Sequence, residues 1–453
     1  MQQLRDRSSR NRTGQDILTF PGEDRYENAR RAFNLAADQR PDVVALPRNA
    51  LDVTDALRLS VDSGLRVAPQ RTGHGATVLP PLKGALLLRT DLMRELEIDL
   101  RRRRARVGAG MRWQDIVRRL SPHGLAALHG SAPDVGIVGY TLGGGLSWYA
   151  RRHGLAAHHV TAIELVTADG RWHRVDHDKD PELFWALRGG GGSFGVVTAL
   201  EFALVPVPEL YAGALFFEWE RSQEILHAWR AWVADVPDEL TSVGRILRFP
   251  PLPEIAEPLR GNGFVLVEAA YLGSEADGAE LLAPLRRLRP RLDTFSDAAP
   301  ADIAQLHMDP PEPVAGDGGG QLLSSLPACA LDDIVDLVGP GSDSPLLSFE
   351  LRHLGGALAR QDPEHGVLGA LPAAFASFAA GITPDGAVAA AVRERLDAVA
   401  GALGPYAGAY AFPNFTLHAQ DPSRFFDEPS LARLRQVRAR TDPDGLFIAK
   451  HAV

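Results

Sequence analysis

The sequence predicts an α+β protein whose middle third carries an antiparallel sheet flanked by helices. Helical and strand-like segments alternate up to residue 205, and the run 206–208, Pro-Val-Pro, then breaks the pattern. Beyond this break, strand-like and helical segments continue with different spacing and without an internal repeat. A chain of 453 residues is long enough for two domains or one large composite.

The first part of the chain predicts short buried strands joined by helices. Asn49 precedes a segment with helical spacing that ends at Gly64, as helices often end at glycine. The helix at 180–187 has proline in its first turn, where no N–H donor is needed. A hairpin is expected around Arg101. The expected strands are 42–47, 65–69, 84–88, 160–167 and 196–205, and the other expected helices are 52–64 and 113–120.

The middle part predicts the antiparallel sheet. Residues 348–353 alternate cleanly, which puts Ser348, Glu350 and Arg352 on one face of a strand. Residues 309–320 are rich in proline, glycine and acid, so we expect a mobile loop there. The remaining expected strands are 212–219 and 263–271, and the expected helices are 222–234, 275–288 and 387–402.

Composition and charge exclude several classes of function. Hydrophobic residues make up 45% and charged residues 23%, the proportions of a soluble globular protein. The net charge of −9 argues against nucleic acid or an anionic membrane as the main partner. The single Cys329 excludes a disulfide framework and a cysteine-rich metal site, and the adjacent His158 and His159 lack a carboxylate partner nearby, so we expect no metal. A loose polar tail over 1–15 and the lack of a long apolar segment predict a cytoplasmic protein.

Three glycine-rich loops, at 70–76, 136–145 and 188–195, are the strongest functional signal. Backbone without Cβ atoms can approach a bulky anion and present N–H groups to it. A tight turn without a ligand would explain any one loop alone, but three loops indicate a large phosphorylated cofactor. His74 lies between two glycines of the first loop and adds a nucleophile that could bond to that cofactor.

The third loop satisfies the dinucleotide fingerprint Gly-x-Gly-x-x-Gly, but its context is wrong for a Rossmann site. Such a site needs a strand before the pattern and a helix after it. Here the helix 180–187 comes first and the strand 196–205 follows. No P-loop lysine follows any of the glycine loops, which argues against a nucleoside triphosphatase. What remains is a nest of N–H groups suited to a diphosphate.

These residues resemble the flavin oxidases of the vanillyl-alcohol oxidase superfamily, with its PCMH-type FAD-binding domain, and most closely the berberine-bridge-enzyme-like branch. The resemblance rests on the motifs at 41–47, 52–74, 130–136, 143–145, 151–155, 180–197, 412–415 and 442–447. It implies a two-part FAD-binding domain, 16–206 and 407–453. The inserted segment 207–406 would be a substrate-binding domain whose antiparallel sheet roofs the isoalloxazine ring.

The resemblance also implies FAD held by a single covalent bond, from His74 to the 8α-methyl group. Many members of the branch add a second bond from a cysteine, but here Ala132 occupies that position. The further cofactor contacts that the resemblance implies are Gln70, Arg71, Thr72, Gly73, Gly75, Ala76, Pro133, Asp134, Val135, Gly136, Gly139, Leu142, Gly143, Gly144, Gly192, Val196, Val197 and Asn414.

The implied reaction removes a hydride from a C–H of a small organic substrate (an alcohol, sugar, phenol or secondary metabolite) while a base takes a proton. The tyrosine that often serves this purpose in the family is replaced by Phe412, which cannot take a proton, and Lys450 stands where an asparagine is usual. The candidate catalytic residues are His153, Tyr149, Tyr410, Glu350 and Arg352.

Val135 bears on how the reduced flavin would be reoxidised. In this branch, valine three residues after the cysteine position is associated with access of O2, so the resemblance implies an oxidase that produces hydrogen peroxide. Two alternatives stay open. The first is a dehydrogenase that passes electrons to another acceptor, and the second is a non-catalytic descendant that binds flavin or another ligand.

Overall fold

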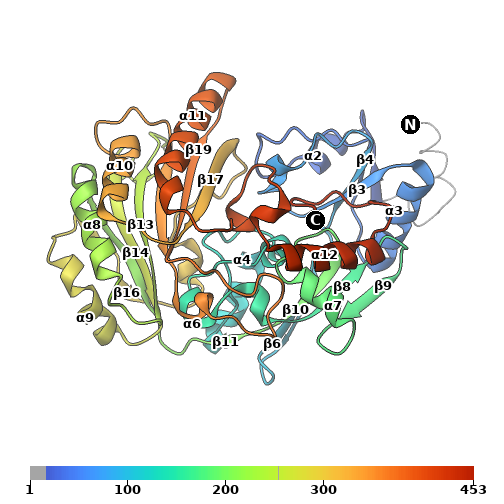
Figure 1. Ribbon diagram of the computed structural model, residues 1–453, viewed down its shortest axis with the longest axis horizontal. Helices are drawn as coiled ribbons and strands as arrows, with labels where there is room; N and C mark the ends of the chain where they lie inside the picture. Colours follow the sequence, from blue (N-terminus) through green and yellow to red (C-terminus); the bar gives the residue numbers. More distant parts are fainter. Residues whose placement is uncertain (1–16, 254) are drawn as a thin grey trace.

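The N-terminal part of the chain is built on a four-stranded sheet (Figure 1). The structure is a computed structural model that describes residues 17–253 and 255–453, so the tail expected over 1–15 lies outside the described residues. The sheet runs in the order β1 (Leu18–Thr19), β2 (Val43–Ala45), β4 (Ala85–Arg89), β3 (Arg66–Gln70), and the helices beside it are α2 (Tyr26–Arg30) and α3 (Ala50–Ser63). The Asn49 side chain caps α3 and Gly64 ends it at φ 67°, which confirms the predicted helix.

A five-stranded antiparallel sheet follows and carries the second and third glycine loops. Its order is β5 (Leu96–Asp99), β6 (Arg104–Gly108), β10 (Val196–Ala203), β8 (Val160–Val166), β9 (Trp172–Val175). The helices of this part are α4 (Trp113–Leu120), α5 (Ile137–Leu142), α6 (Ala150–His153) and α7 (Pro181–Leu187). A small ribbon pairs β7 (Leu125–Ala126) with β11 (Val205–Pro206). The third glycine loop lies between α7 and β10, the reverse of the Rossmann order, as predicted.

The middle of the chain forms an eight-stranded antiparallel sheet, which confirms the α+β prediction. Its strands run in the order β15 (Leu292–Asp293), β12 (Tyr211–Glu218), β14 (Gly263–Tyr271), β13 (Leu240–Arg248), β18 (Ser348–His353), β19 (Phe375–Ile382), β17 (Gly316–Leu323), with β16 (Ser296–Asp297) beside β12. Helices cover the face turned away from the N-terminal part (Figure 1): α8 (Ser222–Trp232), α9 (Glu275–Arg286), α10 (Ala328–Val338) and α11 (Gly386–Leu403). None of the described helices combines the length and the hydropathy of a membrane span.

Strand β17 corrects the second part of the loop expected over 309–320, whereas the described residues 309–315 form no regular helix or strand. Its glycine run pairs with β19 along the whole strand, from Gly316 opposite Ile382 to Leu323 opposite Phe375. A Cβ atom on Gly320 would lie 2.1 Å from the carbonyl oxygen of Ser377, so the close approach of the two strands requires the missing side chain. The local composition indicates a turn, but pairing with a distant strand decides the conformation.

The C-terminal segment returns to the first sheet. Helix α12 (Glu428–Thr441) lies over the N-terminal part in Figure 1, with the chain end close by. Val67 of β3 donates its N–H to Leu446 at 2.8 Å and accepts from the N–H of Ile448 at 2.7 Å. Phe447, between these two residues, is fully buried in the core around β3 and β4.

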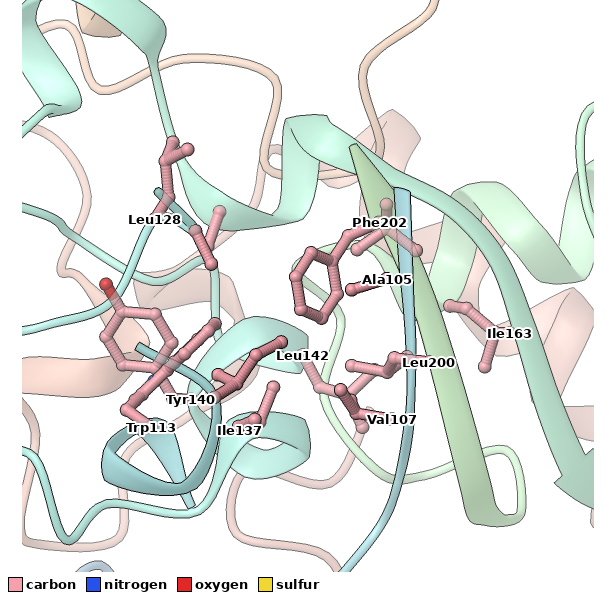
Figure 2. Packing of buried hydrophobic residues seen from close by; sticks show 14 of the residues in the cluster. Ala105, Val107, Trp113, Leu128, Ile137, Tyr140, Leu142, Ile163, Leu200 and Phe202 are labelled. Carbon is pink, nitrogen blue, oxygen red and sulfur yellow. The ribbon is translucent and has the colours of Figure 1, made fainter. Parts of the chain in front are cut away.

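A buried apolar cluster packs against helix α5, which forms part of the second glycine loop (Figure 2). Ile137 and Leu142 of α5 point into this cluster together with Val107, Leu200 and other side chains of the five-stranded sheet. Trp113 packs edge-on against Tyr140, with ring centroids 5.4 Å apart. Because these side chains are close-packed, the loop that leads into α5 has a rigid base.

We expect Phe447→Ala to lower the free energy of unfolding by about 3–5 kcal/mol, because it removes a fully buried ring and leaves a cavity. Leu51→Ala is the control: this side chain is 77% exposed on α3, and its loss should cost less than about 0.5 kcal/mol. Urea unfolding followed by circular dichroism measures both. Equal losses in the two variants would contradict the packing of the C-terminal segment on β3.

Candidate cofactor and substrate site

One cavity of about 390 Å³ lies where the three glycine loops, the C-terminal segment and strand β18 meet. The two sheet systems of the molecule therefore both contribute to its wall. The predicted cofactor contacts that line it are Gln70, Arg71, Thr72, Gly73, His74, Gly75, Ala76, Val135, Gly136, Gly139, Leu142, Gly143, Gly192, Val197 and Asn414.

Four predicted contacts do not line the cavity, and several lining residues had not been predicted. The four are Pro133, Asp134, Gly144 and Val196; of these, Val196 is fully buried in the core around β3 and β4. Lining residues that were not among the predicted contacts include Ser131, Tyr140, Phe415 and His451, together with Lys450, which the sequence marked only as a departure from the family. His451 follows the 442–447 motif almost directly, which is the signal that could have identified it.

His74 is held on three sides. Its Nδ1 lies 2.8 Å from the hydroxyl of Thr72, its Nε2 lies 3.0 Å from Oδ2 of Asp134, and its ring stacks on Phe33 with centroids 3.9 Å apart. Gly73, just before it, has φ of 83°, and a Cβ atom there would lie 2.8 Å from the Cβ of Ala32. Glycine is therefore required to turn the chain so that the histidine faces the cavity.

Asn414 joins the C-terminal segment to the second glycine loop. Its Nδ2 donates to the carbonyl of Tyr140 at 3.1 Å, and a Cβ atom on Gly143 would lie 2.4 Å from its Oδ1. The close approach of this amide to the loop backbone thus depends on glycine at position 143. In contrast, Gly139, Gly191 and Gly192 have open space where a Cβ atom would be, so their backbone faces the cavity freely.

Arg352 and Glu350, two of the candidate catalytic residues, lie on β18. Arg352 lines the cavity, whereas Glu350 is buried behind it and accepts from the Arg352 Nε at 2.7 Å. The second oxygen of Glu350 is hydrogen-bonded to His307 Nε2, so both carboxylate oxygens are engaged. Burial alone would raise the pKa of Glu350, but Arg352 and His307 hold it below its ordinary value.

His307 is a buried residue that no motif in the sequence indicated. Its Nδ1 lies 2.6 Å from Oε2 of Glu268, and its Nε2 contacts Glu350. Although burial and Arg245 lower its pKa, the two carboxylates raise it to about 9, so the imidazole is protonated at neutral pH. His307 therefore acts as a cation between two carboxylates.

The other three candidate catalytic residues do not line this cavity, which corrects their expected placement. Tyr149 is fully buried in the core and packs edge-on against His129. His153, at the end of α6, packs against His159, and burial lowers its pKa to about 4. Tyr410 lines a second cavity of about 210 Å³ beside β17. A motif fixes a residue's place along the chain, but not the direction in which its side chain points.

Comparison with known families identifies the part of the chain that carries the first glycine loop. Residues 41–176 match the family described as "FAD binding domain". This part of the chain is therefore similar to an FAD binding domain. It includes His74 and the second glycine loop, whereas the third loop and the C-terminal segment lie outside the matched range.

Individual relatives extend this result. (R)-6-hydroxynicotine oxidase of Paenarthrobacter nicotinovorans is 34% identical over 209 residues, which are 46% of this chain and 45% of that protein. Glucooligosaccharide oxidase of Sarocladium strictum is 33% identical over 217 residues, 46% of this chain and 43% of that protein. In sequence, the match thus spans less than half the length of these two relatives.

A solved structure accounts for the remainder of the fold. BBE-like 1 of Physcomitrella patens superposes with a TM-score of 0.85 at 19% identity, over 99% of this chain and 98% of that one. Nearly the whole chain therefore has the fold of this berberine-bridge-enzyme-like protein, which confirms the fold that the sequence motifs predicted.

The cavity, which residues of the matched range line in large part, fits a ligand rich in hydrogen-bonding groups. Three of the residues that line it carry buried polar atoms without a partner in the described chain: the Tyr140 hydroxyl, Oδ1 of Asn414 and both ring nitrogens of His451. Each such atom costs about 1–3 kcal/mol unless a ligand completes its hydrogen bonds. The isoalloxazine, ribityl and diphosphate groups of FAD offer donors and acceptors of this kind.

The charge of the wall also suits FAD. Arginine and lysine contribute three cations to the described residues that line the cavity: Arg71, Arg352 and Lys450. None of these described lining residues is Asp or Glu. Lys450 donates to the carbonyl of Pro413 at 2.8 Å, and burial lowers its pKa to about 8. An anionic diphosphate or flavin would supply the missing counter-charge.

Lys450→Met should stabilise the apoprotein at pH 7 by about 1–2 kcal/mol, because the folded chain then buries no ammonium. The folded pKa of Lys450, about 8, lies below its ordinary value of 10.5. The charged Lys450 therefore lowers the free energy of unfolding by its full amount below pH 8, and this loss disappears as the pH rises to 10.5. The stability difference between wild type and variant, from urea unfolding at each pH, should shrink over this range.

The exposed Lys83 provides the matched control, since Lys83→Met removes the same charge from the surface. That variant should show a small difference from wild type that does not change with pH. A pH-independent difference for Lys450→Met as well would contradict the buried charge.

Proposed function

We propose that this chain is an FAD-dependent oxidase of a small organic molecule. The shared cavity carries the proposal, because it is lined by the three glycine loops, by His74, by residues with unpaired polar atoms and by Arg352 of the eight-stranded sheet. Two sequence relatives are named as oxidases, which supports the same class of activity. Bound FAD supplies the acceptor for a hydride from a substrate C–H. The protein's residues hold the cofactor, orient the substrate and control the surrounding charge.

His74 would hold FAD covalently through the flavin 8α-methyl group. Because an ionised carboxylate only accepts hydrogen bonds, Asp134 fixes the imidazole with its proton on Nε2. Nδ1 then keeps a lone pair, which accepts from the Thr72 hydroxyl at 2.8 Å, and it is the nucleophilic nitrogen. Ala132, which also lines the cavity, offers no second bond.

Arg352 would contact the substrate, and Glu350 would act through it as a positioning residue. Arg352 reaches the cavity from a central strand of the sheet, between β13 and β19, so its position does not depend on a loop. The two oxygens of Glu350 are engaged by Arg352 and His307, so this carboxylate is not free to take a proton.

One observation favours the second candidate function, a flavin-binding protein without catalysis. Phe412 is 1% exposed and replaces the expected proton acceptor, while Tyr149, His153 and Tyr410 do not line the cavity. A purified protein whose flavin no alcohol, sugar or phenol reduces under anaerobic conditions would favour this candidate over the oxidase.

Val135 supports O2 as the electron acceptor, since it lines the cavity and is smaller than the residues associated with dehydrogenases of the branch. A dehydrogenase with another acceptor is the alternative. Reoxidation by O2 would yield hydrogen peroxide.

Covalent attachment predicts that the yellow colour stays with the pellet when the purified protein is precipitated with acid. His74→Ala should release the flavin into the supernatant. Asp134→Asn should lower the bonded fraction several-fold, because the amide no longer fixes the imidazole tautomer. The exposed Asp178→Asn is the control and should retain all of its flavin. Absorbance of pellet and supernatant measures each; colour released from wild-type protein would refute the bond.

The oxidase assignment predicts that anaerobically reduced protein, mixed with air-saturated buffer, is reoxidised much faster than free flavin. Val135→Ile should slow this step several-fold by narrowing the approach to the cavity. Val138→Ile is the matched control, because it adds the same methylene group to another lining valine. Stopped-flow absorbance follows the reaction, and a wild-type rate no greater than that of free flavin would favour the dehydrogenase.

A further inference from the structure

Behind Arg352, six charged side chains and one hydroxyl form a closed ring of polar contacts. In order, the ring is Ser131, Asp309, Arg245, Glu268, His307, Glu350 and Arg352, which returns to Ser131. Glu268 and Glu350 come from strands β14 and β18. Ser131 lies within the range that matches the FAD binding domain, and its hydroxyl closes the ring by contacting Asp309 at 3.4 Å and Arg352 at 3.3 Å. The ring thus joins the sheet to the loop beside the cofactor cavity.

The ring balances its own charge. With His307 protonated it contains three cations, His307, Arg245 and Arg352, and three carboxylates. Glu350 is shared between Arg352 and His307, so it neutralises Arg352 only in part. Of the three cations of the ring, Arg352 is the one that lines the cavity.

Only part of the Arg352 guanidinium is used within the ring. Its Nε donates to Glu350 at 2.7 Å and its Nη2 donates to Ser131 at 3.3 Å, whereas a guanidinium has five N–H groups. The Cζ atom lies 5.2 Å from the ring centroid of Phe415, which also lines the cavity. Donors remain for a ligand, next to an aromatic surface on which its apolar part can pack.

We propose that Arg352 recognises a carboxylate on the substrate. This inference rests on the proposed function, since the substrate is the one oxidised in the flavin cavity. Among the described lining residues no Asp or Glu competes for the guanidinium from within the cavity. Arginine and carboxylate match in geometry as well as in charge, so the pair distinguishes a carboxylate from a neutral group of equal shape.

The test compares benzoate with benzamide, which has nearly the same shape without the charge. Each is titrated into the purified yellow protein, and the dissociation constant is taken from the change in the flavin absorption spectrum. We expect benzoate to bind about tenfold to a hundredfold more tightly than benzamide, as a charge-assisted hydrogen bond predicts. Arg352→Gln should abolish this preference, and Arg352→Lys should keep a reduced one.

Arg360→Gln is the matched control. This exposed arginine belongs to the same part of the chain and pairs with Asp238 at 3.3 Å, away from the cavity. The variant should keep the wild-type preference for benzoate. A thermal melt of each variant shows whether it is folded.

Two results would overturn the inference: equal affinities of wild-type protein for benzoate and benzamide, or an undiminished preference in folded Arg352→Gln. If Arg352→Gln does not fold, the inference is tested by two other results: the ratio of the benzamide and benzoate dissociation constants in wild-type protein, and the decrease of this ratio in Arg352→Lys. Yellow protein without a preference refutes the carboxylate alone and leaves the oxidase proposal standing. Colourless protein that releases no flavin on denaturation refutes the proposed function, and this inference with it.

Discussion

The pairing of residues 446–448 with strand β3 is the constraint on which the site depends. Val67 is hydrogen-bonded to both Leu446 and Ile448, only a few residues before the first glycine loop begins. This pairing brings Lys450 to the cavity, where its side chain reaches Gly75. A cofactor bound in this cavity would touch both the first glycine loop and the C-terminal segment. Its binding would therefore stabilise the pairing of these two segments.

Three carboxylates each contact a side chain of the cavity wall without lining the cavity themselves. Asp134 contacts His74, Asp91 pairs with Arg71 at 2.7 Å, and Glu350 pairs with Arg352. Each carboxylate orients a cationic or basic side chain without presenting its own charge to a ligand. The wall is thus positive and well ordered at the same time, two properties that an unpaired cluster of arginines would not combine.

Local signals made much of the fold predictable. Helix α3 begins after Asn49 and ends before Gly64, as the capping pattern indicates, and β14 spans the same residues that were expected to form a strand. Strand β17 was not predictable, because a glycine run becomes a strand only through its partner β19. In the site, glycine spacing and motifs predicted most residues that line the cavity, and their contacts with FAD stay predictions. His307 was out of reach, since its partners come from strands far away in sequence.

The closed ring behind Arg352 limits how these residues can change during evolution. Because every charged member faces opposite charges, replacing one of them alone leaves a buried charge without its partner and destabilises the protein. A substitution of one charged member alone is therefore selected against, whereas replacement of the whole charged set by apolar side chains is tolerated far better. Descendants of this sequence should keep the charged set whole or lose it together. The carboxylate preference proposed for Arg352 would then change abruptly between lineages rather than by degrees.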